Sequence, residues 1–92
     1  MAEVNATVLL AGLREYHKSL EKHLRTLEEE YRQVERYWRR FDSVYDGNAA
    51  REFRQNWQQT AAAFSEYQNR GQAIKRILEE RIAALERLDA GR

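Results

Sequence analysis

Cysteine and proline are both missing from this chain of 92 residues. Without cysteine there is neither a disulfide framework nor a thiolate metal site. Without proline the commonest interruption of an α-helix is missing as well. Glycine is scarce, with four residues, and the abundant residue types include alanine, leucine, glutamate and arginine, which favour helices. The sequence therefore predicts one small all-α domain over 1–92.

An excess of charge of one sign is also lacking. The 16 basic and 15 acidic residues leave a formal net charge of +1, which does not favour nucleic acid or an anionic membrane as a partner. The apolar run over 8–13 is too short to span a bilayer, and no basic residue precedes it as a secretory signal requires. We expect no nucleic-acid partner, no stable membrane insertion and no cleaved signal peptide.

The first half of the chain carries an apolar pattern of helical period. One row recurs every seven residues and contains Leu13, Leu20, Leu27, Val34 and Phe41. A companion row, offset by four positions, contains Leu10, His17, Leu24, Tyr31, Trp38 and Tyr45. Leu9, Tyr16 and Tyr37 widen this stripe, and charged residues occupy most of the positions between. The pattern predicts an amphipathic helix over 5–42 with Asn5 as its N-cap.

The second half repeats the pattern. One row contains Ala50, Trp57, Phe64, Gly71, Leu78 and Leu85, and its companion row contains Phe53, Thr60, Tyr67, Ile74 and Leu88. A helix is predicted over 49–89, after a turn over 43–48 in which Asn48 follows the permissive Gly47 and serves as N-cap. Gly71 costs about 1 kcal/mol relative to alanine inside a helix, so we interpret it as a point of close approach or a slight kink.

Two long helices on a short turn must lie antiparallel. Counting outward from the turn pairs Val34 with Trp57, Leu27 with Phe64, Leu20 with Gly71, and Leu13 with Leu78. The residues expected to flank this seam and remain exposed are Tyr16, Tyr31, Trp38, Phe53 and Tyr67. Because a contiguous exposed apolar strip usually marks an interface, we expect two hairpins to close a four-helix bundle. The alternative is a lone hairpin with an aromatic surface.

The candidate interface combines these aromatic residues with neighbouring seam positions. It contains Tyr16, Leu24, Tyr31, Trp38, Phe53, Trp57, Phe64 and Tyr67. The same sequence indicates no catalytic, metal or cofactor site. His17 and His23 are six positions apart, so they do not share a helix face as a metal-ligand pair would, and neither completes a Glu-x-x-His pattern. The acidic run 28–30 is interpreted as a solvated helix face. We expect a protein without enzymatic activity.

The turn and the helix that follows it resemble a known family. Tyr45-Asp46-Gly47 stands at the midpoint of two long helices, and Phe53, Trp57, Phe64 and Tyr67 follow at helical spacing. This arrangement is similar to the WXG family of type VII secretion, typified by the early secreted antigenic target. Those proteins are helical hairpins of about one hundred residues with Trp-x-Gly at the turn. Tyr45 matches the family tryptophan and Gly47 the family glycine.

The resemblance implies a function in protein–protein recognition. The partner would be an identical or paralogous hairpin, an export ATPase or a larger effector, and the protein would be secreted or at the cell surface after a cytoplasmic stage. The export element of the family, Tyr-x-x-x-Asp, does not occur after Leu88, which implies the signal-lacking half of a pair or a relative that does not use this signal. A second hypothesis is a cytoplasmic chaperone or adapter that covers the apolar helices of a larger effector or toxin.

Overall fold

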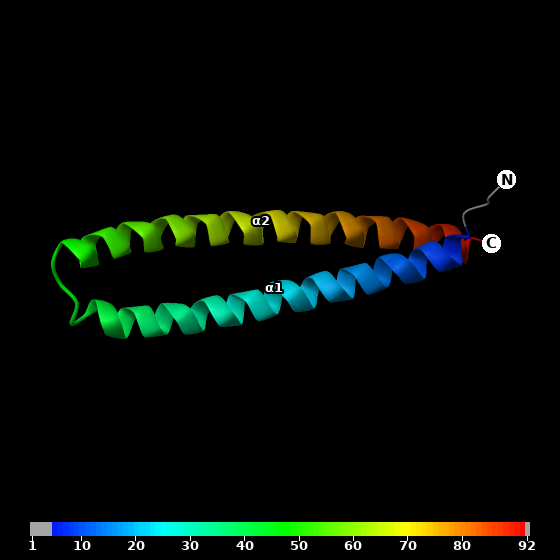
Figure 1. The fold of residues 1–92 in the computed structure, drawn as a ribbon. Coiled ribbons are helices and arrows are strands. Elements are labelled where there is room, and N and C mark those ends of the chain that lie inside the picture. The colour runs from blue at the N-terminus through cyan, green and yellow to red at the C-terminus, as the bar shows by residue number, and fades with distance from the viewer. Residues whose placement is uncertain (1–4, 92) are drawn as a thin grey trace.

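The computed structural model describes residues 5–91, which form two α-helices joined by a short turn (Figure 1). Helix α1 runs from Ala6 to Asp42, and helix α2 from Asn48 to Ala90. The helices are antiparallel, so the start of α1 and the end of α2 lie at the same end of a rod that measures 68 × 20 × 19 Å. The predicted two-helix hairpin is confirmed, and its helix boundaries differ from the predicted ones by one residue or less.

The two helix starts are built differently. At α1, the side-chain oxygen of Asn5 accepts a hydrogen bond from the Thr7 N–H at 2.9 Å, which confirms the predicted N-cap. At α2 the cap position is Gly47, and the prediction of Asn48 is wrong. Gly47 has a φ of +98°, which glycine adopts without steric cost, so the chain reverses there and Asn48 is already helical. The Asn48 side chain instead accepts a hydrogen bond from Arg51.

The seam between the helices is formed by one seven-residue row from each. The α1 seam row contains Leu10, His17, Leu24, Tyr31, Trp38 and Tyr45, and the α2 seam row contains Ala50, Trp57, Phe64, Gly71, Leu78 and Leu85; all of these are buried or half-buried. Tyr31 stacks on Phe64 with ring centroids 4.0 Å apart. The predicted pairing is therefore wrong by about one helical turn on α1, where the companion row faces α2.

The size of the side chains explains this difference. Tyr31 and Trp38 offer large rings that bury far more apolar surface between the helices than Val34 can. Val34, which was predicted to face Trp57, is 52% exposed. The prediction that Tyr31 and Trp38 lie on the exposed flanks is wrong for the same reason.

Gly71 is a point of close approach, as predicted. A Cβ atom at this position would lie 2.5 Å from Cδ2 of Leu24, so only glycine leaves room for the leucine. Leu24 is 3% exposed, and its carbonyl oxygen also accepts a hydrogen bond from Nε2 of Gln68 at 3.2 Å. The contact pins α1 to α2 near the middle of the rod.

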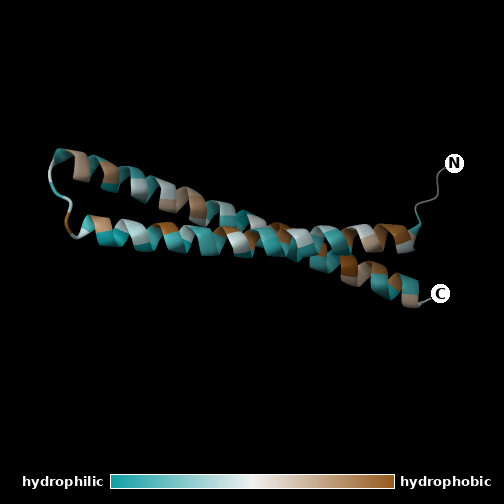
Figure 2. Ribbon diagram, turned by 60° about the horizontal axis from the view of Figure 1, so that its bottom comes forward, coloured by the Kyte–Doolittle hydropathy of each residue, from teal (hydrophilic) through white to brown (hydrophobic). Residues whose placement is uncertain are grey.

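The spacing of the helices changes along the rod. The ribbons are farthest apart beside the turn, converge toward the termini (Figure 1) and cross there (Figure 2). Beside the turn, aromatic rings fill the space: Trp38 lies 4.5 Å from Phe53 and 6.5 Å from Trp57, and Tyr31 lies 5.5 Å from Trp57. Large rings therefore separate the helices at one end.

The hairpin has a small core for its length. Its buried apolar residues are Ala6, Leu10, Leu24 and Ala50. Its accessible surface is 7639 Å², whereas a globular protein of the same mass exposes roughly 5,600 Å². Its radius of gyration is 20.5 Å, against about 12 Å for a compact chain of this length. A large part of the apolar surface is therefore left uncovered by the two helices alone.

Candidate interaction surface

The two sides of the seam differ in chemistry. One side, the polar edge, carries ion pairs that join the helices: Arg14 with Glu86 at 3.1 Å, Glu21 with Lys75 at 3.1 Å, and Asp42 with Arg54. These side chains remain partly or largely in contact with water, which weakens the attraction between their charges. The polar edge therefore sets the register of the helices more than it stabilises them.

The Glu21–Lys75 pair makes the hairpin sensitive to acid. A hydrogen bond from Lys75, together with its charge, lowers the pKa of Glu21 below its ordinary value of 4.5. A carboxyl whose pKa is lower in the folded state stabilises that state fully above its unfolded pKa and loses this contribution as pH falls through the folded pKa. We therefore expect Lys75→Gln to lower the melting temperature at pH 7 and to have much less effect near pH 2.

The check is thermal unfolding, followed by circular dichroism at both pH values. Arg76→Gln, at the next position and without an ion pair in the described structure, is the matched control. A Lys75→Gln effect of equal size at pH 7 and pH 2 would show that the pair contributes nothing of its own.

The opposite side of the seam is the apolar face. On each helix it is formed by the two seven-residue rows that lie next to the seam row on that side. Its large exposed residues, 41 to 84% accessible, are Leu9, Tyr16, Val34, Tyr37, Phe41, Val44, Phe53, Tyr67, Ile74, Ile77 and Leu88. Only one other large hydrophobic residue of the described chain is this exposed, namely Val8. The exposed apolar surface is thus concentrated on one face.

Contacts between the helices show that these rows form one continuous face. His23 of α1 and Tyr67 of α2 are hydrogen-bonded across it, with Nε2 and Oη 2.8 Å apart. Beside the turn, the rings of Phe41 and Phe53 approach to 6.5 Å. Near the termini, the flanking rows meet around a groove that is lined mainly by aliphatic side chains: Leu9, Leu13, Ile77, Arg81, Ala84 and Leu85. The face therefore extends from the turn to the termini.

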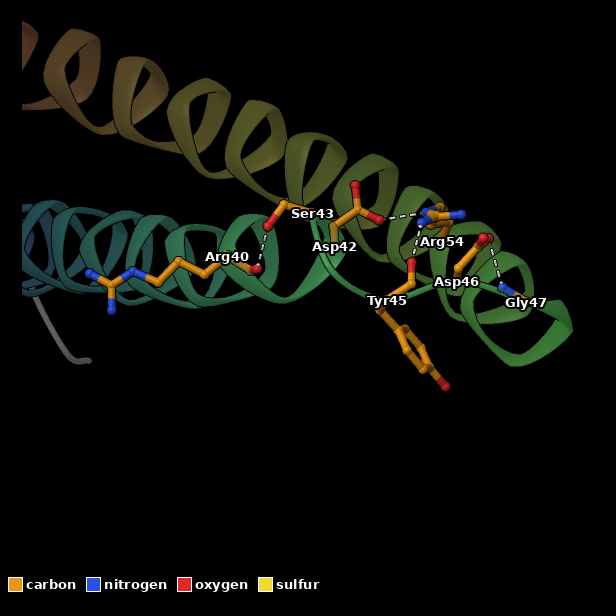
Figure 3. A network of polar contacts seen from close by, with 7 residues as sticks. All are labelled: Arg40, Asp42, Ser43, Tyr45, Asp46, Gly47 and Arg54. Carbon is orange, nitrogen blue, oxygen red and sulfur yellow. Dashed lines mark hydrogen bonds and ion pairs between the residues drawn. The ribbon is translucent and has the colours of Figure 1, made fainter.

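At the turn, Arg54 holds the chain in place (Figure 3). Its Nη2 donates a hydrogen bond to the Tyr45 carbonyl at 2.8 Å, and its Nε donates to the Asp42 carboxylate. The Tyr45 ring points away from these polar groups and packs 4.5 Å from the Phe41 ring. The Gly47 N–H donates to the Asp46 carboxylate at 2.8 Å. The aromatic-x-glycine motif is thus a structured turn whose aromatic ring adjoins the apolar face.

The predicted interface residues fall into two groups. Tyr16, Phe53 and Tyr67 lie on the apolar face and are exposed, as their flanking positions predict. The others lie between the two helices, where Leu24 is buried and the rings are half-buried: Leu24, Tyr31, Trp38, Trp57 and Phe64. Contact of either group with a partner remains a prediction.

Sequence reasoning missed several exposed residues of the face. These are Leu9, Val34, Tyr37, Phe41, Val44, Ile74, Ile77 and Leu88. The row one position before the α1 seam row locates Leu9, Tyr37 and Val44, and the Leu13 row locates Val34 and Phe41. The corresponding two rows of α2 contain Ile74, Ile77 and Leu88. Which rows are exposed follows only from the choice of the seam rows.

No family model, curated protein or solved structure matches this chain. Its surface must therefore be interpreted from its own geometry. Across residues 5–91 there is no cluster of three or more metal-ligating side chains. Neither α1 nor α2, within the described range, has an apolar stretch that would allow it to cross a membrane. The apolar face is the largest feature of the described chain that the fold itself does not account for.

Proposed function

We propose that this protein is a recognition module that works by pairing its apolar face with another helical hairpin. The observation that carries this proposal is the concentration of the exposed large hydrophobic residues, all but Val8, on one side of the seam, with ion pairs on the other. Exposed large hydrophobic residues gathered on one face of a molecule usually mark an interaction site. A second hairpin laid on it would complete a four-helix bundle.

The available area agrees with such a complex. The hairpin exposes roughly 2,000 Å² more than a globular chain of its mass would, whereas a standard interface removes about 800 Å² from each partner. Covering the apolar face would remove part of this excess from water. The polar edge and the outer helix surfaces would remain in water.

We further propose that the pairing serves type VII secretion, with this chain as a WXG-like substrate or partner. The support is the turn: Tyr45 and Gly47 stand where the family has tryptophan and glycine, between two helices of 37 and 43 residues. Gly47 has the positive φ that the reversal needs, and Tyr45 places a ring beside the apolar face.

Export is tested directly in the source organism. A tagged chain is expected in the culture medium of intact cells, and it should disappear from the medium when the gene for the membrane ATPase of the export system is deleted. A cytoplasmic protein of the same size is the control for lysis. Retention of all the tagged chain inside wild-type cells would contradict the secretion role and leave the pairing of hairpins to be tested separately.

The second candidate is a chaperone or adapter that covers the apolar helices of a larger effector. The same apolar face favours it, because an amphipathic helix of an effector would fit where the second hairpin does. Its distinguishing result is a larger protein recovered in a one-to-one ratio with the chain from cell extracts, with none of the chain in the medium. Recovery of the chain only with hairpins of its own size would contradict it.

A further inference from the structure

One row of the apolar face, which runs along α1 into the turn, has a chemical order that is complementary to its own reverse. In chain order it contains Leu9, Tyr16, His23, Glu30 and Tyr37 on α1, and Val44 follows at the same spacing in the turn. The ends are aliphatic, the next positions are both tyrosine, and the central positions are an imidazole and a carboxylate. An interface between identical chains related by a two-fold axis needs a surface that is complementary to itself. This row has that property about a point between His23 and Glu30.

We propose that the partner is a second copy of this chain, and that His23 of each copy binds Glu30 of the other across the apolar face. The two-fold axis crosses the rod near Leu27, so α1 lies antiparallel on α1 of the second copy. Tyr16 of each copy then faces Tyr37 of the other, and Leu9 faces Val44. The two His23–Glu30 contacts lie on either side of the two-fold axis, at the centre of the dimer. This inference rests on the proposed pairing of hairpins and names its partner and its central contact.

Helix α2 supports the same axis independently. The contacts of Tyr31 with Phe64 and of Leu24 with Gly71 set which level of α2 lies beside each level of α1. An axis near Leu27 then falls between Gln68 and Asn69. When this axis relates the two copies, large residues in the exposed rows of one α2 face small residues of the other copy's α2. The resulting pairs are Phe53 with Ala84, Ile74 with Ala63, and Leu88 with Ala49. Alternating large and small side chains is what a packed layer requires.

The charges on the face agree with this arrangement. Glu30 is the only acidic residue of its row, and it has no ion-pair partner within the described chain. The same axis brings Arg70 of one copy to the level of the Tyr67 ring of the other, where a guanidinium and an aromatic ring attract each other. A carboxylate on an apolar interface needs a polar partner, and the arrangement supplies one.

His23 is prepared for this contact by its neighbour on α2. Its Nε2 is engaged with the Tyr67 hydroxyl at 2.8 Å, and the ring packs edge-on against the Tyr67 ring with centroids 6.0 Å apart. Nδ1 is the ring nitrogen left for a further hydrogen bond, and a carboxylate is the strongest acceptor for it.

Two single variants that complement each other test the contact. His23→Glu places two like charges at each of the two central contacts, and Glu30→Lys removes the hydrogen-bond acceptor from each of them. Each variant alone is therefore expected to raise the dimer dissociation constant by about tenfold or more. In an equimolar mixture, the mixed dimer has a new Glu–Lys pair at one contact and an unaltered His–Glu pair at the other. The mixture should therefore associate within about threefold of the parent. Sedimentation velocity over a concentration series measures all three constants.

Glu29→Lys is the matched control, because it makes the same charge change one position away, on the outside of the bundle. It should leave the dissociation constant unchanged. Recovery of association in the mixture cannot arise within one chain, because the two substitutions are on different chains. If the parent is dimeric but the mixture does not recover, the His23–Glu30 contact alone is overturned. A parent chain that never associates would overturn the proposed pairing of hairpins as well.

A second measurement applies if either variant loses its helicity. The chain has no cysteine, so Tyr16→Cys and Tyr37→Cys each introduce a single thiol on the apolar face. Under mild oxidation, a covalent dimer is expected to form rapidly from the mixture of the two variants and slowly from either alone. Faster cross-linking within one variant than in the mixture would contradict the antiparallel arrangement of the two α1 helices.

Discussion

Replacing Trp57 by alanine is expected to lower the free energy of unfolding by about 3 kcal/mol. The indole lies in the seam between Tyr31, whose ring is stacked on it at 5.5 Å, and Trp38, whose ring is 6.5 Å away. Loss of the ring would remove one contact from each of these neighbours and leave a cavity beside the turn. A small domain has a total stability of only about 5–15 kcal/mol, so the effect should be large.

The measurement is urea unfolding at one fixed protein concentration, since association would make the stability depend on concentration. Trp57→Phe is the control, because it keeps a ring in the stack and should recover most of the loss. An alanine variant that unfolds at the same urea concentration as the parent would mean that the Trp57 ring does not belong to the seam.

The contact between Leu24 and Gly71 predicts a reciprocal effect of side-chain size. Leu24→Ala removes the most buried leucine and is expected to cost about 2–5 kcal/mol. Gly71→Leu overpacks a point of close approach between the helices and is expected to cost about 1–3 kcal/mol. The double variant exchanges a large and a small residue across the seam. It should therefore be more stable than the sum of the single effects allows.

A double-mutant cycle, measured by chemical unfolding of all four proteins under the same conditions, gives this coupling. The paired control is Leu24→Ala with Gly12→Leu, because a Cβ at Gly12 meets no other atom within 4 Å. Strict additivity in the Leu24–Gly71 pair, matching the control pair, would place these residues out of contact.

The hairpin itself could be predicted from the sequence, because it depends on periodicity and on local turn chemistry. Two apolar stripes of helical period, a glycine at the midpoint and the absence of proline are enough to predict two antiparallel helices. Asn5 as N-cap and Gly71 as a close approach were also accessible, since each depends on one residue and its neighbours.

The rotation of α1 could not be predicted in the same way. The Leu13 row and the companion row are both apolar, and periodicity alone does not decide which of them faces α2. The choice depends on how the Tyr31 and Trp38 rings pack against Phe64 and Trp57, which is a property of the two helices together. The apolar face is the side of each stripe that the seam leaves uncovered. An error in the rotation of α1 therefore also shifts the predicted position of this face.

The central claim is that a second hairpin covers the apolar face, and the most direct test is the mass of the protein in solution. Light scattering coupled to size-exclusion chromatography at micromolar concentration is expected to give twice the 11.0 kDa of the single chain. Tyr37→Glu, which places a charge on the apolar face, should shift the mass toward 11.0 kDa with its helices intact, whereas Arg36→Glu on the adjoining outer surface should not. A parent chain that is well folded and monomeric at these concentrations would contradict the account.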